Sequence, residues 1–234
     1  MDLNKVNLNL EYFELESKRY TKLAGESIDK CSLNYLESKR KVIRKEYSSG
    51  GGILERGYYC PSLIYDIVVG NCNRGRLIKK LTAKSKPTYE YGFDADDRLI
   101  TITQFADAPY FSDTYEVIKY NGRTSMGFVF ENKPSLEIRA INECIYDDNN
   151  RIISFTRALG NGDGKVIDEI YKELYTYDER GLYVVQVYSF LSISTSRLSH
   201  EKYIFSHNDE GYLNEYITNG LVYKVYIKRK VWYS

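Results

Sequence analysis

The feature that most constrains the fold of this chain is a hairpin motif at residues 175–182, Tyr-Thr-Tyr-Asp-Glu-Arg-Gly-Leu. Tyr175 and Tyr177 are two residues apart, so they share one face of an extended strand. The Asp178 carboxylate can accept hydrogen bonds from backbone N–H groups further along, and Gly181 can take a positive φ, which together favour a tight turn. The segment from Leu182 onward is β-branched and aromatic, as half-buried strands are. The motif therefore predicts two strands joined by a tight turn.

Diluted copies of this turn recur along the chain at intervals of 22 to 31 residues, which is the signature of a repeated supersecondary unit. The anchor residues of the copies are Gly50, Gly75, Asp97, Gly122, Asn150, Gly181 and Gly211. Prolines fall about midway between anchors, and proline lacks the N–H that a central strand needs. These prolines are Pro61, Pro87, Pro109 and Pro134, and later midway breaks fall at residues 160–164, 192–199 and 219–220. The two classes of break are therefore expected at opposite ends of the strands.

We predict a single all-β domain over residues 1–234, an antiparallel meander of about fifteen strands built from hairpin repeats. Because an open sheet rarely exceeds about ten strands without curling, it should roll into a barrel, a spiral or a sandwich. Three sets of alternating residues are predicted to share a face. The sets are Tyr89, Tyr91 and Phe93; Met126, Phe128 and Phe130; and Leu182, Val184, Gln186 and Tyr188.

Two segments leave a helix open as an alternative. Residues 1–31 could include a short helix, but the Tyr12 and Ser17-Lys18-Arg19 pattern is echoed at residues 35–40, which favours extra strands. Residues 166–174 also fit a helical period. Their alternation runs directly into the hairpin motif, so we predict a strand there.

Composition excludes several function classes. Lys and Arg total 33 against 32 Asp and Glu, so the net charge of +1 creates no overall field that favours nucleic acid or an anionic membrane. The 24 tyrosines suit half-wet sheet faces and binding surfaces. The chain start lacks the features of a signal peptide, and no apolar run reaches the roughly 18 residues of a membrane helix. Cys31, Cys60, Cys72 and Cys144 are scattered along the chain with no C-x-x-C pair, which indicates reduced thiols and not a disulfide framework or a zinc site. We expect a cytoplasmic protein that binds no membrane.

The pattern Tyr-x-Tyr-Asp-x-x-Gly-x-Leu resembles the YD repeat of the RHS family. Residues 175–182 carry it most completely, with one spacer residue lost before Leu182, and residues 91–99 and 146–152 are close copies. Residues 71–77 and 207–213 are diverged copies, and the resemblance covers about residues 60–220. Family repeats are spaced more tightly, and family chains are far longer. The resemblance implies a non-catalytic hairpin scaffold, and, as the nearest role, a stand-alone immunity protein that binds a cognate bacterial toxin.

No catalytic, metal or cofactor site is expected. Residues 160–166 are similar to a calcium loop, but Leu159 and Ile170 would occupy the first and last ligand positions, which require acidic side chains. His200 and His207 lie near serines in the sequence, yet no nucleophile elbow or orienting acid accompanies them. We therefore predict that the protein is not an enzyme.

The turns offer a candidate site for a protein partner. In a meander, alternate turns lie at the same end of the sheet, so the acidic residues of these turns should line one rim. The predicted partner-binding residues are Asp96, Asp97, Asp147, Asp148, Asp178, Glu179, Asp209 and Glu210. Such a rim would attract a basic partner, for example a toxin domain. Turn chemistry alone also explains these acids, and arginines occupy the same turns.

Two alternatives remain open. The C-terminal segment, residues 223–233, mixes basic and aromatic residues. Together with exposed tyrosines it could bind nucleic acid or carbohydrate, with Lys228, Arg229 and Trp232 as the residues to test. Lysines also protect an exposed edge strand from pairing, which explains the same segment without a ligand and makes nucleic acid the less favoured partner. The third possibility is a structural fragment of a larger repeat array that has no ligand.

Overall fold

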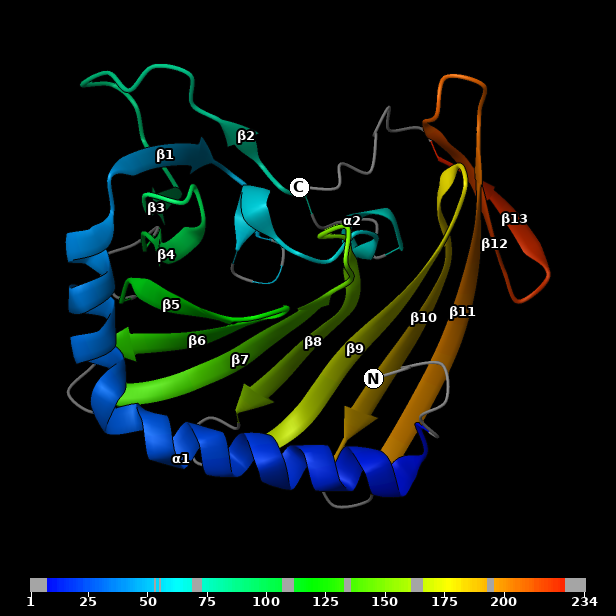
Figure 1. Ribbon diagram of the computed structural model, residues 1–234, viewed down its shortest axis with the longest axis horizontal. Helices are drawn as coiled ribbons and strands as arrows, with labels where there is room; N and C mark the ends of the chain where they lie inside the picture. Colours follow the sequence, from blue (N-terminus) through cyan, green and yellow to red (C-terminus); the bar gives the residue numbers. More distant parts are fainter. Residues whose placement is uncertain are drawn as a thin grey trace.

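The computed structural model describes residues 8–52, 54, 56–68, 73–106, 112–132, 136–160, 166–192 and 196–225. Thirteen strands of the described residues form one sheet in the order β13-β12-β11-β10-β9-β8-β7-β6-β5-β4-β3-β1-β2. From β3 to β13 each strand pairs antiparallel with its neighbour in sequence, which confirms the predicted meander. The sheet is strongly curved but does not close into a barrel, and β13 and β2 are its edges (Figure 1).

The strands are β1 (Arg44–Ser49), β2 (Arg76–Leu77), β3 (Tyr89–Phe93), β4 (Leu99–Gln104), β5 (Thr114–Asn121), β6 (Thr124–Asn132), β7 (Leu136–Tyr146), β8 (Ile152–Gly160), β9 (Ile167–Asp178), β10 (Gly181–Leu191), β11 (Arg197–His207), β12 (Leu213–Thr218) and β13 (Leu221–Lys224). The helices are α1 (Leu10–Lys41), the 3-10 helix η3 (Gly57–Tyr59) and α2 (Tyr65–Val68). β9 confirms the strand predicted over residues 166–174.

The extra strands favoured for residues 1–31 were wrong where the structure describes this region, because Leu10–Lys41 form the 32-residue helix α1; residues 1–7 lie outside the described residues. Asn9 caps the helix, since its Oδ1 accepts a hydrogen bond from the backbone N–H of Tyr12 at 3.0 Å. The buried positions form one stripe with helical spacing. They are Phe13, Ser17, Tyr20, Ala24, Cys31 and Tyr35. The echo between Tyr12 and Tyr35 therefore lies within a single helix and is not a strand repeat.

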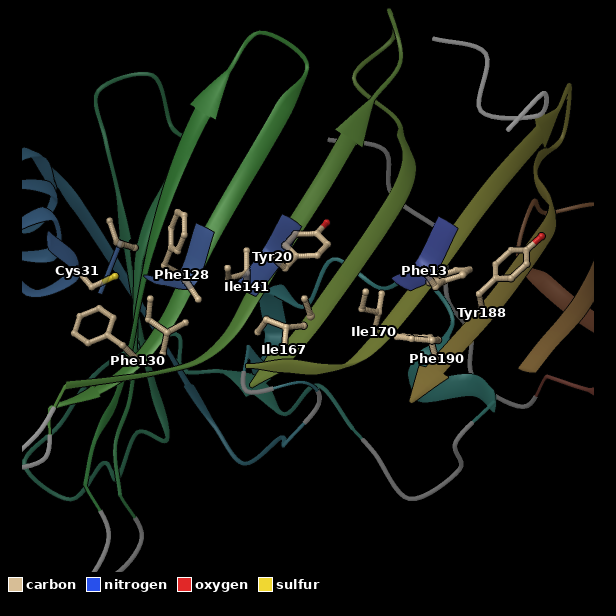
Figure 2. Close-up of a cluster of buried hydrophobic side chains, with 14 of the residues drawn as sticks. Phe13, Tyr20, Cys31, Phe128, Phe130, Ile141, Ile167, Ile170, Tyr188 and Phe190 are labelled. Carbon is tan, nitrogen blue, oxygen red and sulfur yellow. The ribbon is translucent and has the colours of Figure 1, made fainter. Parts of the chain in front are cut away.

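α1 packs along one face of the sheet (Figure 2). The Phe13 ring lies 5.7 Å from Tyr188 and 5.9 Å from Phe190 of β10, centroid to centroid. At the other end of the helix, Tyr35 contacts the ring of Phe130 at 6.0 Å. Ser17 Oγ donates a hydrogen bond to the carbonyl oxygen of Ile167 at the start of β9. Tyr35 also lies within hydrogen-bonding distance of Thr103 Oγ1 of β4, at 2.6 Å, so the helix bridges the strands from β4 to β10.

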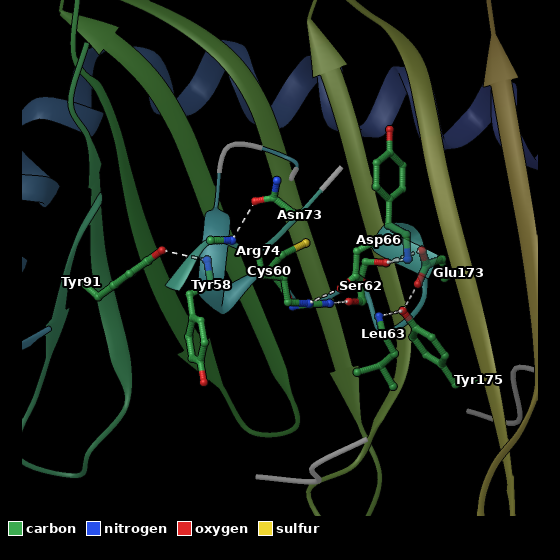
Figure 3. A network of polar contacts seen from close by, with 12 residues as sticks. Tyr58, Cys60, Ser62, Leu63, Asp66, Asn73, Arg74, Tyr91, Glu173 and Tyr175 are labelled. Carbon is green, nitrogen blue, oxygen red and sulfur yellow. Dashed lines mark hydrogen bonds and ion pairs between the residues drawn. The ribbon is translucent and has the colours of Figure 1, made fainter. Parts of the chain in front are cut away.

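The opposite face is covered by residues 54 and 56–68, which include η3 and α2 and which we call the 54–68 segment, and by residues 73–75 (Figure 3). Ile64 packs there in a cluster with Phe155 and Leu182, while Tyr89 and Tyr91 belong to a neighbouring cluster. Covering on both faces explains why the central strands are buried on both sides.

Strand alternation was predicted correctly for two of the three sets. Tyr89, Tyr91 and Phe93 are buried together, and Met126, Phe128 and Phe130 all pack against the α1 cluster. The set that begins at Leu182 was wrong. The pairing of β9 and β10 shifts between Leu182 and Val184, and this β-bulge inverts the side-chain phase. Leu182 consequently faces the 54–68 segment, while Tyr188 faces α1.

The predicted separation of the two classes of turn holds from β3 onward in the described residues. The turns anchored at Asp97, Gly122, Asn150, Gly181 and Gly211 join odd strands to even ones, whereas the break at residues 219–220 joins β12 to β13. Pro109 and Pro134 lie outside the described residues. Gly50 and Gly75 were wrongly assigned to this class. β1 runs antiparallel to β3, so the end of β1 lies beside the start of β3, at the opposite end of the sheet. There the two glycine segments pack backbone against backbone: a Cβ on Gly51 would lie 2.6 Å from the carbonyl carbon of Arg74.

Candidate functional site

The acidic turns share one hydrogen-bonding scheme. In three of them, Oδ1 of Asp94, Asp147 or Asn208 accepts hydrogen bonds from the backbone N–H groups two and four residues later, at 2.9–3.1 Å. The residue three positions later takes a positive φ of 60° at Asp97 and 59° at Asn150. The Asp or Asn side chain that begins each of these turns thus satisfies the backbone N–H groups, as the turn chemistry predicts.

The β9–β10 turn is one residue shorter. Asp178 Oδ1 accepts hydrogen bonds from the N–H groups of Arg180 at 2.8 Å and Gly181 at 3.1 Å, and Gly181 pairs directly with Asp178. The turn is one residue short before Leu182, and the strand has one extra residue after Leu182, the bulged Tyr183. The bulge therefore compensates for the missing spacer residue. The shorter turn and the bulge together explain why the face of β10 could not be read from alternation.

The topology places all eight predicted partner-binding residues at the same end of the sheet, but arginines neutralise half of them. Arg44 donates from Nη2 to Asp97 at 2.6 Å, and Arg98 pairs with Asp96 at 2.8 Å. The other two pairs are Arg151 Nε with Asp147 at 2.7 Å and Arg123 with Asp148. The rim from β3 to β8 therefore carries little net negative charge.

The other half differs. Asp178, Glu179, Asp209 and Glu210 are exposed, and none of them forms an ion pair with any residue in the described ranges. We call these four residues the acidic turn pair. Its two turns are close enough for Asp178 to act on His207: burial lowers the pKa of His207, and the Asp178 charge opposes this shift.

A buried polar network lies under the 54–68 segment. The Glu116 carboxylate accepts hydrogen bonds from Arg56 Nε at 2.7 Å and from Asn142 Nδ2 at 3.0 Å. Arg157 Nη1 donates to the Leu54 carbonyl at 2.9 Å. Gly127 lies against this network, because a Cβ there would overlap the Glu116 carboxylate. These groups attach the segment to the middle of the sheet.

A second buried network surrounds Glu173 (Figure 3). Its carboxylate accepts a hydrogen bond from Ser62 Oγ at 2.6 Å and others from the hydroxyls of Tyr171 and Tyr175. Complete burial raises the pKa of Glu173 above its ordinary value. Arg74 pairs with Asp66 at 3.1 Å. The network holds residues 62–66 on β9.

A cavity of about 260 Å³ lies between strands β8 and β9 on one side and Gly52, Leu54 and Tyr65 on the other. Its wall combines Arg157 and Glu169 with tyrosine rings and apolar side chains. The lining residues are Gly52, Leu54, Tyr65, Arg157, Leu159, Glu169 and Tyr171. No sequence signal connects these residues, because they meet only through the folding of Gly52, Leu54 and Tyr65 onto the sheet.

The other candidate residues, a histidine and the described cysteines, pack against neighbouring side chains or are buried. His200 stacks on Tyr188 at 4.4 Å between ring centroids. Cys31, Cys60 and Cys144 are buried free thiols, and burial raises the pKa of Cys144 to about 11. Within the described residues, no group of three potential metal ligands occurs, and no helix is long and apolar enough to cross a membrane. Cys72, residues 161–165 of the calcium-like loop, and Lys228, Arg229 and Trp232 lie outside the described residues.

Sequence reasoning overlooked one charged segment. Residues 73–88 contain no Asp or Glu, and five of their basic side chains are exposed. These are Arg76, Lys79, Lys80, Lys84 and Lys86. A scan of local charge would have found them, but the balanced total charge conceals them.

Comparison with known proteins adds no assignment. No family model matches this chain, and the search of curated proteins found no match.

Proposed function

We propose that this protein is a non-enzymatic protein-binding module of the immunity type, which binds a basic region of a partner protein through the acidic turn pair. The observation that carries the proposal is the difference between the two halves of the rim. Arginines pair with the acids of the β3–β8 turns, whereas Asp178, Glu179, Asp209 and Glu210 form no ion pair in the described structure.

The charge arrangement suits a basic surface. The β9–β10 and β11–β12 turns are two strand spacings apart, roughly 10 Å. Four carboxylates thus lie close together, with Arg180 as the basic residue in the same turns. A cation that approaches between two turns roughly 10 Å apart lies about 5 Å from each. This is within the Debye length of about 8 Å at physiological salt, so both turns attract it. Such a patch accelerates encounter with a basic partner and disfavours acidic ones.

The turns are also rigid, which lowers the entropic cost of binding. Backbone N–H groups hold Asp178 and Asn208 at 2.8–3.1 Å. The buried carboxylates of Glu116 and Glu173 are engaged in attaching residues 54–66 to the sheet. Because these two buried carboxylates serve to hold the structure together, they favour the interpretation that the protein is a scaffold that binds a partner through its surface.

The test is calorimetric titration of this protein with a basic toxin domain, the class of partner that the proposal names. Glu179→Lys, Asp209→Lys and Glu210→Lys in one variant should weaken binding at least tenfold and reduce its salt dependence, because attraction becomes repulsion. Asp178 is retained because it closes its turn.

The matched control reverses Asp96, Asp97 and Asp148, which carry the same number of charges on the paired half of the rim. This control should bind within about threefold of the wild type. Equal losses in both variants, or none in the first, would count against the acidic turn pair as the binding surface.

A further inference from the structure

The segment from Arg76 to Lys86, which we call the lysine finger, projects from the sheet edge beside β1 and β2 (Figure 1). Its two ends are fixed to the same strand. The backbone N–H of Ile78 donates to the Tyr47 carbonyl at 2.8 Å, and that of Thr88 donates to the Ser48 carbonyl at 2.7 Å. The finger is therefore a loop with an anchored base.

The tip of the finger is a closed turn. Ser85 N–H donates to the Thr82 carbonyl at 2.9 Å, and Thr82 N–H donates to Ser85 Oγ at 2.9 Å. The two hydroxyl oxygens lie 3.0 Å apart. These contacts fix the backbone from Thr82 to Ser85, so the neighbouring side chains project from a preformed loop.

The cations of the finger differ from those of the adjacent strand. On β1, Arg44 pairs with Asp97 at 2.6 Å and Lys45 with Glu90 at 3.0 Å. The five finger cations are exposed, and none makes an ion pair with the residues that the structure describes. They are Arg76, Lys79, Lys80, Lys84 and Lys86. Their field is opposed by no carboxylate in residues 73–88.

An apolar side chain lies among these cations. Leu81 is 49% exposed, and it is followed after one residue by the exposed Ala83. We propose that the lysine finger docks on an anionic phospholipid surface, with its lysines at the headgroup phosphates and Leu81 entering the interface. A leucine flanked by lysines is the combination that interfacial binding uses, in which apolar burial adds to attraction by anionic lipid.

Nucleic acid is the competing polyanion, and two features favour lipid. Residues 76–86 contain no aromatic ring that could stack on a base. The exposed Leu81 has no role in contacting phosphates, whereas it can enter a lipid interface. A peripheral finger of this kind needs no membrane-spanning helix. The proposal replaces the expectation from the sequence that the protein binds no membrane, because the balanced total charge conceals the finger.

The test is sedimentation of the full chain with vesicles of phosphatidylglycerol and phosphatidylcholine. The wild type should bind the anionic vesicles, release with added salt, and ignore pure phosphatidylcholine. Each lysine near the surface contributes roughly fivefold, so Lys79→Gln, Lys80→Gln and Lys84→Gln together should weaken binding about 100-fold. The control, with Lys18, Lys30 and Lys202 changed to Gln, has the same net charge and should retain binding within about threefold.

Leu81→Ser separates lipid from other polyanions. It should weaken vesicle binding roughly tenfold, because burial of the side chain is lost, and leave any binding to duplex DNA unchanged. Failure of the wild type to bind anionic vesicles would overturn the proposal, as would equal loss in the control. The proposal would also be overturned if the wild type bound DNA more tightly than anionic vesicles and Leu81→Ser left the DNA binding unchanged. That result would assign the finger to nucleic acid. None of these variants touches the acidic turn pair, so partner binding is tested separately.

Discussion

At the residue scale, several charged and polar side chains are buried inside the molecule, where they contact one another and do not face solvent. The Arg56 and Glu116 side chains are only 6% and 3% exposed, and they form a charged pair with Gly127 packed against it. Removing a buried charge from water is costly, so such a pair depends on its geometry and its additional hydrogen bonds. Asn142 supplies one of these bonds to Glu116 at 3.0 Å.

Gly127→Ala should therefore destabilise the protein by about 3 kcal/mol, because the added methyl group displaces the Glu116 carboxylate from Arg56. Urea unfolding measures the change. The control is Gly25→Ala on α1, where a Cβ meets nothing within 4 Å. That variant should gain up to about 1 kcal/mol from helix propensity. A Gly127→Ala protein as stable as the wild type would contradict the packing described for the pair.

Glu173 predicts a pH dependence. Burial raises its folded pKa above the ordinary value of 4.5, so the folded state binds more protons than the unfolded state between pH 4.5 and the folded pKa. Its contribution to stability is present below pH 4.5 and is lost as the pH rises through the folded pKa. Glu173→Gln removes this titration, so the Gln variant should gain stability relative to the wild type as the pH rises.

The measurement is the difference in unfolding free energy between the two proteins at several pH values. Taking the difference removes the other carboxylates, which titrate in both. These include Glu143, whose burial is outweighed by Arg19 and Tyr20, so that its pKa is lowered. A difference that does not change with pH would show that Glu173 does not titrate as inferred.

At the element scale, α1 is part of the core. Phe13 is fully buried between α1 and β10, next to Tyr188 and Phe190. Phe13→Ala should cost about 3–5 kcal/mol, because it removes a large side chain and leaves a cavity. Leu15→Ala, at a helix position that is 58% exposed, should change stability by less than about 0.5 kcal/mol. Similar losses at both positions in denaturant titrations would contradict the orientation of the helix.

Elements were predictable to different degrees. Turns such as residues 147–151 could be predicted because an Asp side chain and a residue that tolerates positive φ are only three positions apart. The helix was missed because the echo of residues 12–19 at residues 35–40 was interpreted as a strand repeat, although the buried residues from Phe13 to Tyr35 follow a helical period. The face of β10 was missed because one bulge after Leu182 inverts every later side chain.

At the scale of the whole molecule, the net charge of +1 conceals two separate regions of opposite sign. The acidic turn pair belongs to β9–β12, and the lysine finger belongs to the opposite edge of the sheet, beside β1 and β2 (Figure 1). The topology separates them along a sheet of thirteen strands. The two proposed surfaces can therefore act independently, one toward a basic protein and the other toward anionic lipid.

The amino-acid sequence by itself determined the meander, because strand alternation and turn chemistry depend on residues within a few positions of one another. It also determined which end of the sheet most of the acidic turns occupy. Only the tertiary structure decided which acids stay unpaired, since Arg44 reaches Asp97 across the pairing of β1 with β3. The tertiary structure also decided that α1 covers one face of the sheet and the 54–68 segment covers the other. Each of these two hydrophobic clusters forms only when residues far apart in the sequence come into contact.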